Sequence, residues 1–275
     1  MPTAAGNEVI LRFEDVSVAF DDVTALDRLS FEVRPAQTKI ILGAAGSGKT
    51  TLLKTAIGLV RPDSGRVFLF GEDITRMDEH KLFHLRARVG VLFQEGGLFD
   101  SLTVADNVAY PLIYQPAIKT PASQVMPKVE DALGFVELEH TVDKLPSQLS
   151  GGMRRRVGIA RAVVTEPPLV LYDSPTAGLD PITANTIMAL IAKERDTADT
   201  ANIIVTHRFQ DGQLMANFRY NRGSERLEPV PVNGARKDTG TQFMVLNEGR
   251  LVFEGSLAEL ESSKDEYISK FVMRR

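Results

Sequence analysis

Apolar and polar residues alternate in two short runs near the start of the chain, at residues 9–13 and 29–33. Alternation with a period of two is typical of strands that have one buried face. Asp21 and Asp22, between the runs, are typical of a turn. The pattern predicts an antiparallel β layer at the N-terminal end.

From residue 40 onwards, short continuous apolar runs alternate with longer segments that have helical periodicity. Strands that alternate with helices predict a mostly parallel sheet covered on both faces, which is an α/β fold. The runs predict strands at 40–42, 66–70, 89–93, 169–172 and 202–205, and helices from about 51 to 58, at 76–87, 152–164 and 181–194.

The pattern changes between residues 94 and 147, where helical segments at 104–108 and 124–133 dominate and prolines punctuate them. We interpret 94–147 as an inserted α-helical subdomain and 1–93 with 148–275 as a discontinuous core. Residues 221–241 are polar and rich in Pro and Gly, which predicts a surface loop or hairpin insertion. A terminal hairpin is expected around 247–249. The prolines that separate the helical segments are Pro111, Pro116, Pro121 and Pro127.

The amino-acid composition limits the classes of function that the protein can have. The 275 residues are 43% hydrophobic and 25% charged, as in ordinary globular proteins. The 32 basic and 36 acidic residues give a net charge of −4, so nothing indicates a nucleic-acid binder. The sequence has no cysteine, no apolar run of roughly 18 residues, and no signal-peptide core near its start. We expect a cytoplasmic protein that reaches a membrane only through a partner.

The octapeptide from Gly43 to Thr50 fits the phosphate-binding pattern G-x-x-x-x-G-K-[ST] between a strand and a helix. Glycines let the backbone point successive N–H groups at phosphate oxygens, and the helix N-terminus favours the same anion. Lys49 is expected to reach the terminal phosphates and the Thr50 hydroxyl to hold Mg²⁺. The residues expected to contact a nucleoside triphosphate here are Gly43, Ala44, Ala45, Gly46, Ser47, Gly48, Lys49, Thr50 and Thr51.

Further candidate residues follow along the chain. Ser150 is placed to cap a helix that begins with Gly151 and Gly152, where a phosphate could approach the backbone. Asp173 ends an apolar strand, as a Mg²⁺-binding Walker B aspartate does. Gln94 and His207 each come at the end of an expected strand, and Asp180 follows shortly after Asp173. These three are the remaining candidates.

Together, the phosphate loop, Gln94, the LSGGM segment, Asp173, Asp180 and His207 resemble an ABC-type nucleotide-binding domain over essentially the whole chain. The resemblance implies a RecA-like P-loop NTPase core, ATP and Mg²⁺ as cofactors, and a head-to-tail dimer with two ATP molecules between its subunits. It implies that Phe20 stacks on adenine and that Ser150, Gly151 and Gly152 bind the ATP of the opposite subunit. It also implies Thr50, Gln94 and Asp173 as metal ligands, and Gln94, Ser174, Asp180 and His207 as catalytic residues.

Residues 93–104 and 106–112 further resemble the ATPases of Mla-type phospholipid transporters. That resemblance implies a membrane permease, an MCE-type lipid-binding protein in the same complex, and a place on the cytoplasmic face of the inner membrane. Residues 94–110 would receive the coupling helix of the permease. We expect the apolar Leu98, Phe99 and Leu102 to be exposed there.

Two departures from the family pattern leave alternatives open. The family places a glutamate after the Walker B aspartate, where it orients the attacking water, and this chain has Ser174. A missing general base typically costs roughly 10²- to 10⁴-fold in rate. The chain could therefore be a slow ATPase, a degenerate subunit that binds ATP to regulate a permease, or a protein substituted at this position to trap ATP. A soluble ABC ATPase without a permease is a further alternative. Arg208 follows His207 where the family has an acidic residue.

Overall fold

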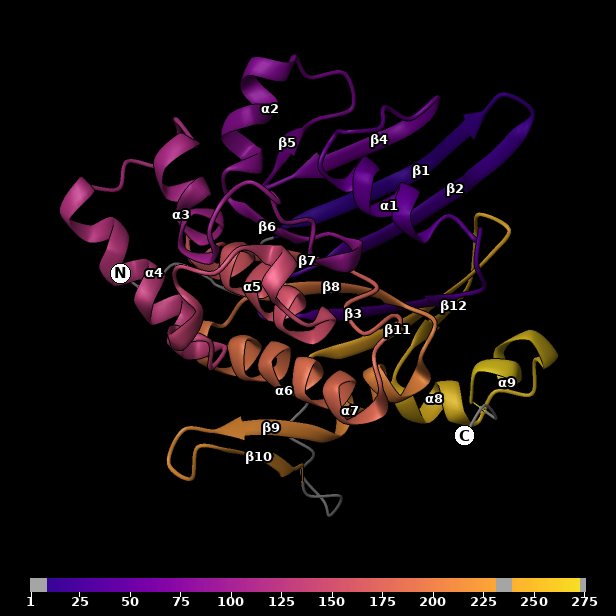
Figure 1. The fold of residues 1–275 in the computed structure, drawn as a ribbon. Helices are drawn as coiled ribbons and strands as arrows, with labels where there is room; N and C mark the ends of the chain where they lie inside the picture. Colours follow the sequence, from indigo (N-terminus) through magenta and orange to yellow (C-terminus); the bar gives the residue numbers. More distant parts are fainter. Residues whose placement is uncertain (1–8, 231–238, 273–275) are drawn as a thin grey trace, which may run out of the picture.

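A central sheet of six strands forms the body of the protein in the computed structural model, which describes residues 9–230 and 239–272 (Figure 1). Five neighbouring strands run parallel and the edge strand β12 is antiparallel, which confirms the predicted mostly parallel sheet. In spatial order the strands are β12 (Arg250–Gly255), β11 (Thr241–Asn247), β3 (Thr38–Gly43), β8 (Ala201–Thr206), β7 (Leu169–Asp173) and β6 (Val89–Leu92).

A separate antiparallel sheet of four strands confirms the predicted N-terminal β layer, although its first two strands are longer than the alternating runs. Asp21 and Asp22 form the turn between them, as expected. In spatial order the strands are β2 (Val23–Val33), β1 (Leu11–Phe20), β4 (Ser64–Leu69) and β5 (Glu72–Asp73).

Side chains on opposite faces of β3 enter two different cores. Ile41 packs with the antiparallel sheet and with α1 (Lys49–Ala56), so α1 lies between the two sheets. Ile40 and Leu42 point to the other face, into a core shared with most of the other helices. Because successive side chains in a strand alternate sides, a strand that is buried on both faces reads as a continuous apolar run.

Helices cover that second face (Figure 1). Pro111 and Pro127 were expected to separate helical segments, and this was wrong, because each lies inside a helix. Burial of Val108, Leu112 and Val129 in the shared core offsets the cost of proline there. The helices on this face are α3 (Val104–Tyr114), α4 (Ala122–Phe135), α5 (Gly151–Val163), α6 (Pro181–Ala198), α7 (Phe209–Asn217), α8 (Leu257–Glu261) and α9 (Glu266–Val272). The remaining helix, α2 (Glu79–Arg86), packs in the core of the antiparallel sheet. Short 3-10 turns lie at Gln94–Gly96, Glu139–Thr141 and Pro146–Gln148.

A two-stranded hairpin, β9 (Phe218–Asn221) and β10 (Arg226–Pro229), occupies the start of the expected 221–241 insertion. The hairpin lies along α6, on the side away from the central sheet (Figure 1). The side chain of Arg222 donates to the carbonyl of Thr197 at the end of that helix. Residues 231–238 lie outside the described residues. The division into a core and a 94–147 helical subdomain stays a proposal.

Among the described residues, no helix is both long enough and apolar enough to cross a membrane.

Candidate functional site

A cavity of about 690 Å³ opens at the edge of the central sheet where β3, β7 and β8 end. The carboxyl ends of parallel strands meet at one edge, so loops far apart in sequence come together there. The phosphate loop follows β3, Ser174 follows β7 and His207 follows β8, and all three contribute to the lining. Cavities of this size suit ligands as large as a nucleotide.

The phosphate loop lines one side of this cavity with main-chain groups. Gly46 and Gly48 have φ of 79° and 98°, a left-handed conformation that glycine adopts without strain. A Cβ on Gly48 would stand 2.2 Å from the carbonyl oxygen of Ala25, so β2 and the loop leave no space for a side chain there. In the described part of the chain, no side chain caps the N-terminus of α1. The first-turn amides of α1 have no partner within the helix and suit an anion.

Lys49 is folded back over the loop. Its ammonium group donates to the carbonyl oxygens of Gly43 and Ala44 at 2.8 and 2.7 Å and to the hydroxyl of Ser47 at 3.2 Å. Partial burial lowers the pKa of Lys49, and the nearby Asp173 carboxylate opposes that shift. A phosphate in the cavity would offer this cation stronger, charge-assisted hydrogen bonds than the carbonyl groups do.

Three oxygen-bearing side chains meet between the loop and β7. The hydroxyl of Thr50 donates to one carboxylate oxygen of Asp173 at 3.0 Å, and the hydroxyl of Ser174 donates to the other at 3.2 Å. Mg²⁺ in phosphate-transfer sites is typically held by one or two carboxylates together with substrate oxygens. Thr50 and Asp173 therefore fit a Mg²⁺ ion, and Thr50 and Gln94 both line the cavity.

The segment from Ser174 to Asp180, here called the catalytic loop, is held by the helix that begins at the LSGGM segment. Arg155 on α5 donates to the carbonyl oxygens of Ser174, Pro175 and Ala177 at 2.7 to 2.9 Å. Ser174 itself has φ of 51°, and its amide donates to the carbonyl oxygen of Val205 at 2.9 Å. Arg155 was not among the sequence candidates, because its role arises only from this tertiary contact.

The LSGGM segment and Asp180 stand outside the cavity. Ser150 caps α5 by accepting from the amide of Met153 at 3.2 Å, as its position predicted. Asp180 caps α6, and its pKa is lowered chiefly by the hydrogen bond from the Thr183 hydroxyl. A Cβ on Gly152 would come within 2.5 Å of the Thr183 side chain, so the two helix ends lie side by side. Ser150, Gly151 and Asp180 are exposed on this face.

Some lining residues were missed by sequence reasoning, and some expected residues, among them Phe20, Ser47 and Asp173, are not lining residues. Tyr267, Lys270 and Phe271 on α9 line the cavity although they are more than 200 residues from the phosphate loop. The hydroxyl of Tyr267 donates to the carbonyl oxygen of Leu246 at 3.0 Å and accepts from the amide of Ala44 at 3.4 Å. Phe20 is half exposed at the end of β1 and is not among the lining residues, so its role in adenine binding stays a prediction.

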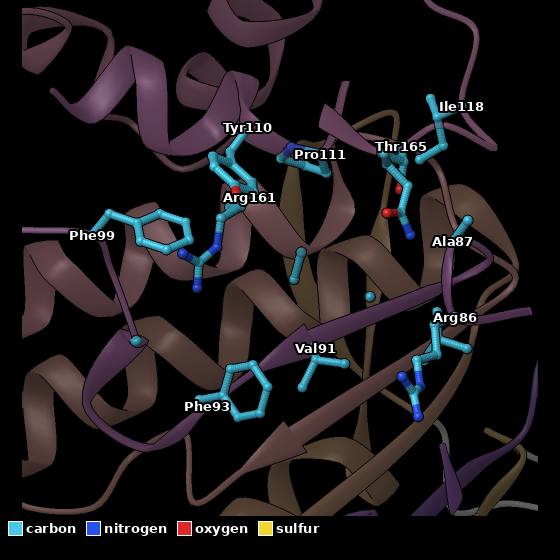
Figure 2. Close-up of a pocket in the computed structure, with 15 residues that line it drawn as sticks. Arg86, Ala87, Val91, Phe93, Phe99, Tyr110, Pro111, Ile118, Arg161 and Thr165 are labelled. Atoms are coloured by element: carbon cyan, nitrogen blue, oxygen red, sulfur yellow. The ribbon is translucent and has the colours of Figure 1, made fainter. Parts of the chain in front are cut away.

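A second hollow, of about 400 Å³, is here called the aromatic groove. Phe99, Tyr110 and Arg161 gather at one end and Arg86 stands at the other, with Val91 and Phe93 between them (Figure 2). The rings of Phe99 and Tyr110 are 4.5 Å apart, and both are more than a third exposed. The Gln94–Gly96 turn connects the two hollows, because Gln94 lines the cavity while Phe93 and Gly97 line the groove.

Asn107, a buried residue of α3, holds the loop that carries Phe99. Its side chain accepts from the amide of Phe99 at 2.8 Å and donates to the carbonyl oxygens of Phe99, Leu102 and Thr103 at 3.0 to 3.1 Å. The expectation that Leu98 and Leu102 are exposed was wrong, since both are partly buried and Leu98 packs against the core. Phe99 is exposed as expected. The exposed aromatic surface therefore comes from Phe93, Phe99 and Tyr110.

Known proteins resemble this chain in sequence and in fold. The family model described as ABC transporter matches residues 26–177. Methionine import ATP-binding protein MetN 2 of Rhodococcus jostii is 40% identical over 87% of this chain and 68% of that protein. The intermembrane phospholipid transport system ATP-binding protein MlaF of Haemophilus influenzae is 33% identical over 78% of this chain and 80% of its own length. The dimeric ATP-binding cassette MJ0796, solved in a post-hydrolysis state with ADP and phosphate, is 26% identical with a TM-score of 0.74, covering 90% of this chain and 98% of that one.

Proposed function

This chain belongs to the ABC transporter family and is an ATP-binding ATPase subunit, and we propose that it energises lipid transport by a membrane permease. The observation that carries the proposal is the aromatic groove beside the ATP cavity. Exposed aromatic side chains in a hollow are typical of a protein-docking surface. A permease segment in the groove would contact the turn that carries Gln94 and so would sense the ATP cavity.

Phospholipid is our proposed substrate class. It is supported by residues 93–104, which form the groove edge and resemble the Mla-type ATPases, and by the similarity to MlaF. An MCE-type lipid-binding protein would then belong to the same complex. Methionine import is the second candidate, favoured by the higher identity to MetN 2. In either case the chain would sit on the cytoplasmic face of the membrane through its permease.

At the phosphates, each group of the cavity has a role that its chemistry permits. Lys49 would bind the terminal phosphates, while Thr50, Asp173 and Gln94 would hold Mg²⁺, which would neutralise charge on the transferring phosphoryl group. The Ser174 hydroxyl can orient a water molecule but cannot deprotonate it at neutral pH. His207 would contact the terminal phosphate. Positioning and charge stabilisation dominate phosphoryl transfer, so hydrolysis without a glutamate is chemically reasonable but slow.

A second copy of the chain would complete the site. Ser150 and Gly151 are exposed at the N-terminus of α5, away from the chain's own cavity, and Ile182 beside them is 80% exposed. A helix N-terminus suits the phosphate of an ATP bound by the opposite copy. Ser150→Arg would fill that face with a bulky cation. We expect this variant to fold and bind ATP but to stay monomeric by light scattering with Mg-ATP, and an ATP-dependent dimer of normal strength would contradict the arrangement.

A turnover assay in the assembled complex tests the function. The tagged chain is used to isolate its permease from native membranes, and ATP hydrolysis is measured after reconstitution with phospholipid, with methionine, or with neither. Stimulation by phospholipid supports lipid transport, whereas stimulation by methionine replaces it with amino-acid import. Absence of turnover in every condition would leave a subunit that binds ATP without hydrolysing it.

A further inference from the structure

Asp211 on α7 is a buried carboxylate that links two loops of the cavity. It is 2% exposed, and one of its oxygens, Oδ2, accepts from the hydroxyl of Thr176 at 2.6 Å and from the hydroxyl of Thr206 at 2.7 Å. Thr176 belongs to the catalytic loop and Thr206 is the last residue of β8. A single oxygen atom therefore joins the loop after β7 to the segment after β8.

Both loops carry residues that face the ATP cavity. Thr206 immediately precedes His207, and its hydroxyl also accepts from the amide of Arg208 at 3.0 Å. The backbone is thus held on both sides of His207. Thr176 comes two residues after Ser174, whose carbonyl oxygen is held by Arg155. Asp211 therefore completes a connection from α7 to both residues that line the cavity at this end, Ser174 and His207.

A carboxylate is a costly choice for a buried structural link. Burial raises the pKa of Asp211, while the hydrogen bonds from Thr176 and Thr206 and the charges of Arg208 and His207 favour its ionised form. The nearest cation, Arg208, has its Nε 3.8 Å from the other carboxylate oxygen. A buried ionised group is stable only when its hydrogen bonds are good, and the ionised form makes those bonds shorter and stronger.

We propose that Asp211 is a positioning residue for ATP hydrolysis, which fixes the catalytic loop relative to His207 through the hydroxyl groups of Thr176 and Thr206. The proposal rests on the assignment of Ser174 and His207 to the reacting phosphate. Asp211 itself touches neither ATP nor the metal site. It keeps the loop after β7 at a fixed distance from the segment after β8. Displacement of a catalytic group by about 1 Å can lower the reaction rate roughly a hundredfold.

The central test is Asp211→Asn, which preserves shape and keeps one acceptor oxygen but removes the charge. Single-turnover hydrolysis with protein in excess over radiolabelled ATP measures the rate even when hydrolysis is slow. We expect the rate constant to fall about tenfold while ATP affinity changes by less than about twofold. A purely structural role would lower the melting temperature and the amount of folded protein, but it would leave the rate per ATP-binding molecule unchanged.

A double-mutant cycle decides whether the effect passes through the two threonines. Thr176→Val and Thr206→Val each remove one hydroxyl at nearly constant volume, and each should slow hydrolysis about threefold. In a chain that carries both valine substitutions, adding Asp211→Asn should lower the hydrolysis rate little further. If Asp211→Asn still lowers the hydrolysis rate tenfold in the chain with both valine substitutions, the proposal is wrong.

The valine variants also keep the proposal testable if Asp211→Asn does not fold. If both hydrolyse ATP at the wild-type rate, Asp211 is not a positioning residue. Failure of the wild-type chain to hydrolyse ATP at all would instead contradict the assigned activity, so the two failures are distinguishable.

Discussion

The cavity beside the phosphate loop takes much of its wall from one continuous segment, residues 43–51, whereas the aromatic groove takes its side chains from α2, β6, the loop after β6, α3 and α5. Main-chain groups and polar side chains form much of the first, together with Tyr267 and Phe271 of α9, and rings and guanidinium groups are prominent in the second. A surface made of backbone tolerates most side-chain changes. A surface made of side chains can change with each substitution, so it is better suited to select a partner.

Electrostatics separates the two regions as well. Lys49 in the cavity has the Asp173 carboxylate nearby, while Arg161 in the groove donates to the carbonyl oxygen of Gly96 at 3.0 Å. Burial lowers the pKa of Arg161, which nonetheless stays protonated. A partner that enters the groove with an acidic side chain would pair with this cation.

Lys49→Ala should have the largest effect, because it removes the one cation that reaches into the cavity from the phosphate loop. Hydrolysis should fall roughly 10²- to 10³-fold, and ATP affinity should fall at least about tenfold. Isothermal titration and a phosphate-release assay measure the two quantities. Lys54→Ala is the matched control, since Lys54 is an exposed lysine on the same helix. Full ATP affinity in Lys49→Ala would mean that the cavity is not the nucleotide site.

Ser174→Glu should act in the opposite direction. The added carboxylate would orient and polarise the attacking water, so turnover should rise at least about tenfold, which corresponds to about 1.4 kcal/mol of transition-state stabilisation. Ser174→Ala is the control and should not accelerate hydrolysis. If wild-type turnover is already fast and the glutamate adds nothing, then Asp180 or His207 orients the water instead.

What could be predicted from the sequence also differs between features that one short segment determines and features that tertiary packing determines. Phosphate-loop geometry, the parallel sheet and the cap at Ser150 depend on short segments, so local pattern was sufficient to predict them. The hydrogen bonds that Arg155 and Asp211 make to the catalytic loop depend on tertiary packing, and no local pattern indicates them. Pro111 was misinterpreted for the same reason, since burial of its helix outweighs the local cost of proline. The conformation of the phosphate loop and the cap at Ser150 were therefore easier to predict than the hydrogen bonds of Arg155 and Asp211.

Phe99→Glu should weaken binding of the permease at the aromatic groove and leave ATP binding in the cavity unchanged. A charge in place of an exposed ring removes apolar contact worth about 1.5–3 kcal/mol, so capture of the permease in a pull-down should fall at least about tenfold. ATP affinity should stay within about twofold of wild type. Val252→Glu is the control, because Val252 is similarly exposed on β12 at the opposite edge of the central sheet. Unchanged capture by Phe99→Glu would place the docking surface elsewhere.

Tyr267→Phe should have the smallest effect, and it tests how far the cavity depends on backbone alone. The change removes the hydroxyl that bridges the carbonyl oxygen of Leu246 and the amide of Ala44. A neutral hydrogen bond contributes about 1 kcal/mol net, so ATP affinity should fall by no more than about fivefold in a titration. Tyr220→Phe on the β9 hairpin is the control for the loss of a hydroxyl far from the cavity. A loss of affinity as large as that of Lys49→Ala would show that α9 helps to form the phosphate loop's conformation, and the cavity would then depend on a distant side chain just as the groove does.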